Sequence, residues 1–468
     1  MGYAQELLRA MGGFSSFAVS FSIISVLTGI TTTYTKGLAG GGPAGLGLGW
    51  PLVAVGTFAV ALAMAELASA FPTAGALYHW SALLGGPGWG WLTAMTNLVG
   101  QCAVVAAIDL GCAREIAAVL GIEGQGATLA VYLAVLASHA LLNVVSVRLV
   151  AWLNDLSATV HVVGVVVLTV LLLVFARRHG GGYLADRSFT SLSSYPLGFC
   201  NALILGMYTF TGYDASAHMS EETHDPARRA PIGILTAVGV SAVAGYAYLV
   251  GLTLAIDDLP ALAKDDHAPL TILQHGLGPT AGRWGMGLAV FAMWFCGLSS
   301  VTSASRTLYA FSRDDGLPFS AAIRKVHPTL KTPHVAIAVA FVAPAVLVVA
   351  TSRLESSFFD AMVSMATMGL YVSYALPIGL GLVARGRGRW RRMGPFHLRG
   401  FGRAVAVLAL GWSAFVLVVC SLPPEVLPSR LFAAMLALLG VAWLVVVRKR
   451  FRGPAITLDA LEADRDAR

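Results

Sequence analysis

The stretch "SFSIISVLTGITTTY", Ser20 to Tyr34, decides the fold, because it is apolar enough to enter a membrane while its centre is a poor helix former. Small, β-branched and hydroxyl residues occupy positions 25–29 apart from Leu27. In a bilayer, a broken helix is tolerated only where the freed backbone groups are buried in protein or line a water-filled cavity. An interruption at Ser25 to Gly29 therefore predicts a binding site. The alternative is an intact helix that merely contains Thr and Gly.

The composition of the whole chain also indicates a membrane environment. Hydrophobic residues make up 57% of the 468 residues, charged residues only 12%, and the mean hydropathy is +0.74. A soluble domain carries roughly 25% charged residues. The five cysteines have no metal or redox spacing, and we find no catalytic triad, phosphate-binding loop or metal cluster. The sequence therefore predicts an integral membrane protein that is not an enzyme and needs no cofactor or metal.

Apolar runs of about 20 residues, the length that an α-helix needs to cross a bilayer, recur along the chain. Hydropathy and flanking polar residues predict an all-α protein of about twelve membrane spans. The spans are expected at residues 14–37, 48–71, 88–112, 127–147, 152–176, 198–218, 231–255, 282–310, 334–352, 357–384, 404–422 and 427–447.

The distribution of Lys and Arg predicts the orientation. With the N-terminus inside, basic residues gather in the cytoplasmic segments, as in the runs 385–403 and 448–452, while the loop at 257–266 is acidic. Both termini are therefore expected in the cytoplasm, with the protein in the cell membrane. The formal charge of +7 follows from basic residues that flank spans, so we expect contact with membrane lipid and no nucleic acid.

A second interruption lies five spans after the first. Span six reads "ALILGMYTFTGYDASAHMSEET", Ala202 to Thr223, and polar residues replace apolar ones in its second half. A pair of interrupted segments in corresponding positions of two halves points to the binding site of an inverted-repeat transporter. The expected organisation is a cytoplasmic N-terminus (1–13), a first repeat of five helices (14–176), a second repeat (198–384), two added helices (404–447) and a cytoplasmic tail (448–468).

Several motifs along the chain resemble the amino acid, polyamine and organocation (APC) superfamily of permeases, in the branch with amino acid, γ-aminobutyrate and choline permeases. The matching motifs are "GGFSSFAVSFSIIS", "GGPAGLGLGWP", "ELASAFPTAGALYHWSALLGG", "NLVGQCAVVA", "GYDASAHMSEET", "SSVTSASRTLYAFSRDDGLP" and "SMATMGLYVSYALPI". This resemblance implies a leucine-transporter-like fold of five plus five inverted helices, in which discontinuous helices one and six hold the substrate. The stretch "ISVLTGI" departs from the bulky residue and proline expected in the first break.

The two breaks predict how a substrate is held. Backbone amides at the first break, with the Ser and Thr hydroxyls, suit a carboxylate, because a helix N-terminus is a positive dipole end. The amide donors are expected from Ser25, Val26, Leu27, Thr28 and Gly29. Carbonyls at the second break suit an amine, and one aromatic ring there is expected as a lid. These residues are Phe210, Thr211, Gly212 and Tyr213.

Asp214 is the most informative single residue, because a carboxylate near the bilayer midplane costs about 2.5 to 3.5 kcal/mol on insertion scales. It is expected as a counter-charge for an ammonium group or as a protonation site. The compatible alternative is a carboxylate that caps the second half of span six.

His161 stands in the apolar sequence "LSATVHVVGVVV", and its imidazole titrates near neutral pH. By resemblance, this part of span five faces spans one and eight, so His161 is the predicted proton carrier. A neutral histidine bonded to a neighbouring helix is the alternative. Sodium coupling also stays open, since span eight offers hydroxyl ligands at Ser299, Ser300, Thr302 and Ser303.

Other polar residues in the spans have weaker predicted roles. Asn97 and Gln101 are expected to line the cavity or to bond between helices, and Tyr371 to gate the site or to stand at an interface. Asp109, His139 and Asn143 are expected to be structural. Glu66, Glu221, Glu222, Arg306 and Arg313 are expected either to form ion pairs that break during transport or to stand at solvated helix ends.

Together these features predict a secondary active permease that takes up an amino acid or a related small amine, such as γ-aminobutyrate, with protons. An exchanger and a choline or polyamine carrier are the alternatives within this fold. A channel or a membrane sensor is the alternative from another class, although the polar residues cluster at two breaks and do not line a continuous path.

Overall fold

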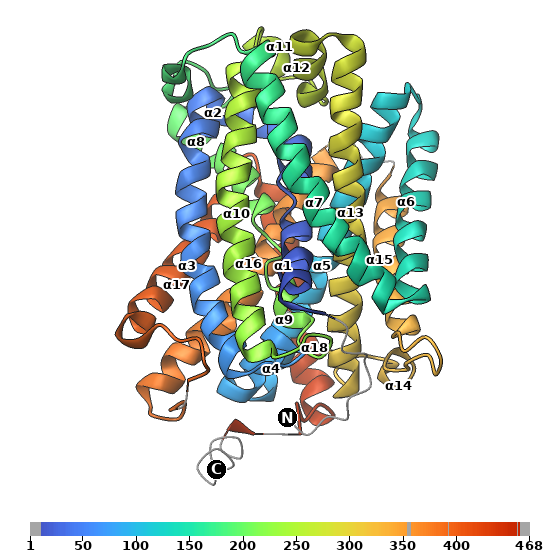
Figure 1. The fold of residues 1–468 in the computed structure, drawn as a ribbon. Helices are drawn as coiled ribbons and strands as arrows, with labels where there is room; N and C mark the ends of the chain where they lie inside the picture. The colour runs from blue at the N-terminus through green and yellow to red at the C-terminus, as the bar shows by residue number, and fades with distance from the viewer. Residues whose placement is uncertain (1–10, 353–356, 392, 456, 459–468) are drawn as a thin grey trace.

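The computed structural model describes residues 11–352, 357–391, 393–455 and 457–458 of the chain. In this part of the chain the long elements are all helices that run side by side in one bundle (Figure 1), and the only strand pairing is an isolated bridge between Met11 and Thr223. The prediction of an all-α membrane protein is confirmed. Most of the predicted N-terminal segment and the last ten residues of the predicted tail lie outside the described residues.

The helices coincide with the predicted spans, but the first span continues ten residues beyond its predicted end at 37 and the third eight residues beyond its predicted end at 112. The first half contains α1 (Gly13–Ile24), α2 (Val26–Gly47), α3 (Gly49–Ala70), α4 (Ala76–Gly85), α5 (Pro87–Leu120), α6 (Gln125–Val145) and α7 (Val147–Leu171). The second half contains α8 (Tyr195–Thr209), α9 (Ala215–His218), α10 (Pro226–Leu254), α11 (Leu259–Leu262), α12 (Ala268–Leu277), α13 (Pro279–Arg313), α14 (Ser320–Ile323), α15 (His334–Thr351), α16 (Ser357–Gly386), α17 (Gly402–Val419) and α18 (Val426–Val445).

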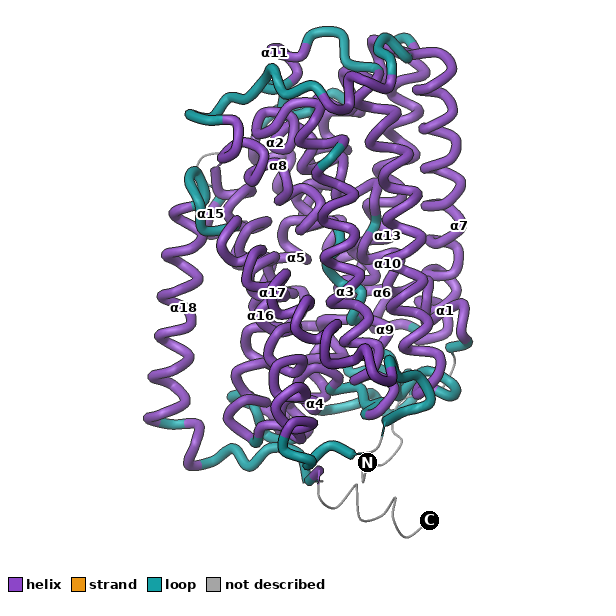
Figure 2. The backbone as a smooth tube through the Cα atoms, turned by 90° about the vertical axis from the view of Figure 1, so that its left-hand side faces the viewer, coloured by secondary structure: helices purple, strands orange, loops and turns teal. Residues whose placement is uncertain are grey.

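Ten helical segments of the described chain are long and apolar enough to cross a membrane, with α1 and α2 taken as one segment. The two remaining predicted spans correspond to α5 and to the discontinuous pair α8 and α9. Burial separates the central spans from the peripheral ones. The most apolar window of α1 and α2 is 83% buried, whereas that of α18 is 6% buried. The first span therefore forms part of the core, and α18 lies along one edge of the bundle (Figure 2).

Local sequence explains several helix ends. Pro87 starts α5, where a missing backbone N–H costs nothing, and Gly121 ends it at φ 67°, a left-handed conformation that glycine adopts without strain. Ser146 separates α6 from α7, and its hydroxyl accepts a hydrogen bond from the Leu149 amide at 3.3 Å.

Both described ends of the chain lie at the same end of the bundle. The Met11 amide bonds the Glu222 carbonyl, and the Phe451 ring packs against Tyr78 and Phe311. We call this the terminal end. The short helices α11 and α12 lie at the other end of the bundle (Figure 1), which we call the opposite end.

Candidate binding site

The first predicted break is present and lies at Ser25. Helix α1 ends at Ile24, α2 begins at Val26, and Ser25 between them has φ 27° and ψ 82°. A left-handed non-glycine residue costs of order 1–3 kcal/mol and persists where its surroundings hold it in place. Here the Ser25 hydroxyl contacts Thr28 Oγ1 at 2.5 Å and His161 Nε2 at 2.6 Å. The prediction that span one is discontinuous is confirmed.

His161 is buried on α7, and its hydrogen bonds define its tautomer. Nδ1 lies 2.8 Å from the Ser157 carbonyl oxygen, which can only accept, so Nδ1 carries the proton of a neutral ring. Nε2 then accepts from the Ser25 hydroxyl. A second proton on this ring would place a donor at Nε2 and force the Ser25 hydroxyl to turn. The predicted proton carrier is therefore bonded directly to the break in the first span.

The second predicted break runs from Phe210 to Asp214, between α8 and α9. Gly212 has φ 92°, and a Cβ atom there would overlap Ile23 Cγ2, so both conformation and space require glycine. A Cβ on Gly29 would overlap the Thr209 side chain. The two broken segments thus pack against each other with glycine at each contact. The prediction that span six is discontinuous is also confirmed.

Only part of the predicted backbone set is unpartnered at the two breaks. The Ser25 amide bonds the Phe21 carbonyl, the Thr28 amide is capped by the Ser25 hydroxyl at 3.3 Å, and the Gly29 amide bonds the Ser25 carbonyl. Within the described residues, Val26 and Leu27 therefore supply the amides that remain. At the second break, among the described residues, Ser20 donates to the Tyr213 carbonyl and the Ala215 amide donates to the Gly212 carbonyl, whereas the carbonyls of Phe210 and Thr211 accept no hydrogen bond.

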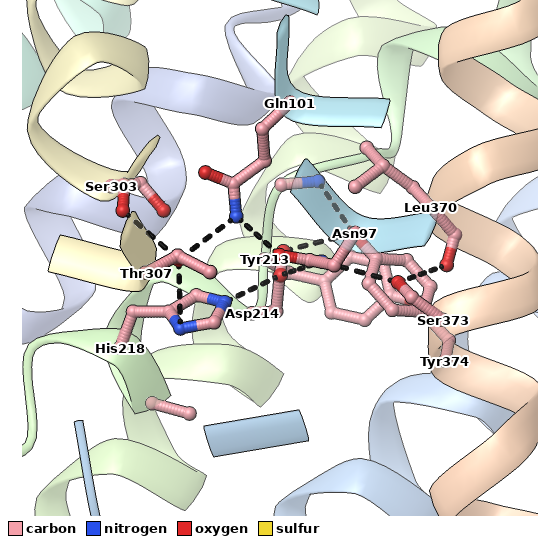
Figure 3. A network of polar contacts seen from close by, with 12 residues as sticks. Asn97, Gln101, Tyr213, Asp214, His218, Ser303, Thr307, Leu370, Ser373 and Tyr374 are labelled. Carbon is pink, nitrogen blue, oxygen red and sulfur yellow. Dashed lines mark hydrogen bonds and ion pairs between the residues drawn. The ribbon is translucent and has the colours of Figure 1, made fainter. Parts of the chain in front are cut away.

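Asp214 lies at the centre of a polar network with residues of α5, α9, α13 and α16 (Figure 3). Its Oδ1 accepts from the Tyr374 hydroxyl at 2.8 Å. Its Oδ2 lies 3.1 Å from His218 Nε2 and 3.4 Å from Asn97 Nδ2. The carboxylate is 2% exposed. Since a carboxylate has about four acceptor positions and three are used here, Asp214 can accept one more donor.

Asn97 and Gln101 extend this network toward α13. Gln101 Nε2 donates to Asn97 Oδ1 at 2.6 Å and to Thr307 Oγ1 at 3.2 Å, and Thr307 Oγ1 lies 3.2 Å from His218 Nδ1. The structure thus brings both predicted residues next to Asp214, and it adds His218, which is buried one helical turn beyond it.

A small cavity of about 20 Å³ lies beside Asp214, room for about one water molecule. Its lining combines apolar residues from three helices with polar groups. The lining residues are Ile23, Gln101, Val104, Gly212, Asp214, Ser300, Ser303 and Leu370. Gln101 Oε1 is buried and has no hydrogen-bond partner in the described chain. Gln101, with its unpartnered amide oxygen, and the Asp214 carboxylate therefore line the same cavity between the two breaks, an arrangement that suits an ammonium group.

The aromatic residues near the breaks make different contacts. Tyr371 points its hydroxyl at Thr57 of α3, 3.1 Å away, and its predicted gate role is untested. Tyr374, one turn further along α16, bonds Asp214, and its ring centroid lies 5.0 Å from that of Tyr213 with the two rings tilted by 42°. The Phe210 ring packs 4.7 Å from Trp50.

The hydroxyl groups of α13 bond both neighbouring helices and carbonyls of their own helix. Ser299 donates to Asn154 Oδ1 at 2.6 Å, and Thr302 donates to Asn143 Oδ1 at 2.8 Å. Ser300 donates to the Cys296 carbonyl of its own helix at 2.8 Å. Across the described ranges, no group of three or more His, Cys, Asp or Glu side chains forms a metal site.

A second buried Asp–His pair lies away from the candidate site. His139 Nδ1 on α6 is 3.2 Å from Asp109 Oδ2 on α5, and both side chains are fully buried. A Cβ on Gly297 of α13 would overlap Asp109 Oδ1, so this glycine makes room for the pair. The contact joins α5, α6 and α13, in keeping with the structural role expected for both residues.

Three ion pairs link helices near the terminal end of the bundle. Arg306 bonds Glu222 at 2.8 Å with both side chains 1% exposed, and Arg313 bonds Glu221 at 2.7 Å. Arg385 bonds Glu66 at 2.5 Å. The predicted charged residues are therefore paired, and the pairs join α13 to the segment after α9 and α16 to α3.

A cavity of 530 Å³, which we call the vestibule, lies toward the opposite end. Its charged lining residues are Lys36, Arg114, Glu115, Asp266, His267, Asp360 and Glu425. On α5, Val104 lines the small cavity and Gly111 lines the vestibule, two helical turns or about 10 Å apart. The candidate site is thus separated from the vestibule by a short distance and from the terminal end by the ion pairs.

Comparison with known proteins identifies what the chain is similar to. A family model described as amino acid permease matches residues 11–444. The amino-acid permease BAT1 of Arabidopsis thaliana is 37% identical over 97% of this chain and 95% of its own length, and its homolog from Oryza sativa subsp. japonica is also 37% identical, over 98% and 95%. The GABA-specific permease of Saccharomyces cerevisiae is 28% identical over 98% of this chain and 85% of its own length.

Proposed function

The chain belongs to the amino acid permease family, whose members are transporters and not enzymes, and we propose that it takes up an amino acid or a related small amine, such as γ-aminobutyrate, together with protons. The observation that carries this proposal is the meeting of two broken helices at a buried carboxylate, Asp214. Transport follows by alternating access across the cytoplasmic membrane.

The substrate lies between the breaks with its two charged ends apart. Its carboxylate faces the start of α2, where the Val26 and Leu27 amides and the helix dipole favour an anion. Its ammonium group faces Asp214, Gln101 Oε1 and the carbonyls of the second break, and the Phe210 or Tyr213 ring acts as a lid. The cavity of about 20 Å³ must widen to admit any amino acid, so binding is coupled to movement of the flanking helices.

His161 carries the proton in this mechanism. The Ser25 hydroxyl donates to its neutral Nε2, and protonation turns that acceptor into a donor. The Ser25 hydroxyl must then reorient, which changes the bonds that hold the break in the first span. A proton on His161 therefore biases the same backbone segment that meets the substrate carboxylate, and this shared segment provides the coupling.

The terminal end faces the cytoplasm and the vestibule faces outside. Positive residues near the terminal end support this orientation. In the conformation described here, the ion pairs of Glu222 and Glu221 with Arg306 and Arg313 close the inner path. They must separate for the substrate to leave, because the pair with Arg306 is fully buried next to α9.

Uptake by purified protein in liposomes tests the proposal. Labelled γ-aminobutyrate and the common amino acids, with choline and putrescine for comparison, are offered with an acidic exterior and without a gradient. Accumulation that requires the gradient and is lost in His161→Gln supports proton-coupled uptake. Uptake that needs no gradient but requires substrate on the far side identifies an exchanger and removes His161 from the mechanism.

A further inference from the structure

The vestibule carries more negative than positive charge. Its lining contains four carboxylates, Glu115, Asp266, Asp360 and Glu425, against two permanent cations, Lys36 and Arg114. This is an excess of two negative charges with His267 neutral and of one with His267 protonated. A concave surface lined by one sign of charge raises the local concentration of ions of the other sign.

The charges are not equally available to a ligand. Lys36 Nζ lies 2.6 Å from Glu425 and 3.8 Å from Asp360, so these three form one cluster. The Arg114 guanidinium lies over the Phe359 ring, 5.0 Å from its centroid, and interacts electrostatically with Asp266, Asp360 and Glu115. Glu115 and Asp266 are therefore the carboxylates that are not held by Lys36.

Glu115 is a buried carboxylate with one free oxygen. Its side chain is 4% exposed, and Oε1 accepts from His267 Nδ1 at 2.9 Å. Oε2 is buried and has no hydrogen-bond partner among the described residues. An unpaired carboxylate oxygen in a largely buried position is costly, and a cationic donor in the vestibule would satisfy it.

The same face of α5 connects the vestibule to the candidate site. Gln101 and Val104 line the small cavity, and Gly111 and Glu115 line the vestibule. From Gln101 to Val104, from Val104 to Gly111 and from Gly111 to Glu115 the steps are three, seven and four residues, so the four positions lie on one face of the helix. A ligand bound at Glu115 is thus aligned with the path toward Asp214.

We propose that the vestibule is an entrance site that binds the ammonium group of the substrate at Glu115 Oε2 and Asp266 before it reaches Asp214. The site admits cationic and zwitterionic amines and disfavours substrates with a net negative charge. This inference rests on the proposed transport function and adds a selection step on the outer side.

Thiol modification in liposomes measures the charge preference without requiring transport. Ser191, which is exposed and lines the vestibule, is replaced in Ser191→Cys. Its rates of reaction with a trimethylammonium and a sulfonate methanethiosulfonate reagent are compared with those of a free thiol. The unsubstituted chain gives the background of the native cysteines, and Thr35→Cys provides a second position in the same cavity.

We expect a preference for the cationic reagent of about tenfold over the free thiol, the low end of what a cleft lined by one sign of charge produces. Adding Glu115→Gln should lower this preference severalfold and Asp266→Asn should lower it further. Glu123→Gln, the same chemical change at an exposed position after α5, should leave the preference unchanged. An unchanged ratio in Glu115→Gln, or an equal effect of Glu123→Gln, would overturn the proposal.

Protection from modification distinguishes an ammonium site from a general cation site. γ-Aminobutyrate and putrescine should slow the reaction, whereas butyrate and sodium chloride at equal ionic strength should not. Equal protection by sodium chloride would contradict ammonium binding. A charge preference and amine protection in a protein without uptake would refute the proposed transport alone, and uptake without them would refute this entrance site alone.

Discussion

Replacing Asp214 by Asn should remove the counter-charge for the substrate ammonium while preserving the shape of the site. In the structure this carboxylate accepts from Tyr374 at 2.8 Å and from His218 at 3.1 Å. The substitution Asp214→Asn replaces one of the two carboxylate oxygens by an NH₂ group, which cannot accept a hydrogen bond. Either Tyr374 or His218 therefore loses its acceptor, and the variant loses both the charge and part of the network that aligns the side chain.

The size of the effect follows from the kind of contact that is lost. A hydrogen bond to a charged group contributes about 1.5–3 kcal/mol, more than a neutral one. At about 1.4 kcal/mol for each factor of ten, loss of one such contact weakens binding by roughly 10- to 150-fold. We therefore expect Asp214→Asn to raise the KM for γ-aminobutyrate, or for whichever amino acid is transported, at least tenfold.

Uptake into liposomes over a range of substrate concentrations measures this KM, and a thermal unfolding curve reports whether the variant is folded. Asp109→Asn is the matched control, because Asp109 is equally buried and also pairs with a histidine, yet it does not line the small cavity. A folded Asp214→Asn protein with unchanged KM would refute the assignment of Asp214 as the ammonium partner. An equal rise in KM in Asp109→Asn would show that the effect is not local.

Three further predictions concern coupling, helix contact and pH. His161→Gln should abolish accumulation driven by a pH gradient while retaining exchange of labelled for unlabelled substrate, and loss of both activities would contradict a pure coupling role. Gly29→Ala should destabilise the protein by about 1–3 kcal/mol, because the new Cβ would overlap the Thr209 side chain. Adding Thr209→Ala should restore part of the lost thermal stability, and no restoration would argue against this contact. The hydrogen bond to Glu115 raises the pKa of His267, against the effect of burial. The stability that the protonated His267 adds to the folded protein is therefore fully present below about pH 6.5 and is lost as the pH rises through the raised pKa. The difference in thermal unfolding midpoint between wild type and His267→Gln should accordingly shrink from about pH 6 to about pH 9, and a gap that widens would reverse the sign of the argument.

The positions of the two breaks could be predicted from the sequence because their cause is local. Small and β-branched residues around Ser25, and glycine with polar neighbours around Gly212, are poorer helix formers than the apolar residues that flank them, although α13 stays helical through a similar run at 296–305. The prominence of Asp214 likewise follows from one charged residue in an apolar span. The partition of the chain into two inverted repeats is untested and stays a prediction.

The partners of these residues could not be predicted, because they depend on how distant helices pack. Tyr374 bonds Asp214 across 160 residues of sequence, and Gly29 of the first span meets Thr209 of the sixth. His218 carried a weak signal, since it lies four residues after Asp214 and so one turn away on a helix. The pairing of Asp109 with His139 was not predicted, because two isolated polar residues in different spans do not indicate a contact.

The most direct test of the account is a structure of the protein in lipid determined by electron cryo-microscopy with the transported amino acid bound. We predict ligand density between the two breaks, with the ammonium group within hydrogen-bond distance of Asp214 and Gln101 and the carboxylate at the start of α2. Density that lies elsewhere in the bundle, or that reverses the two ends of the substrate, would contradict it.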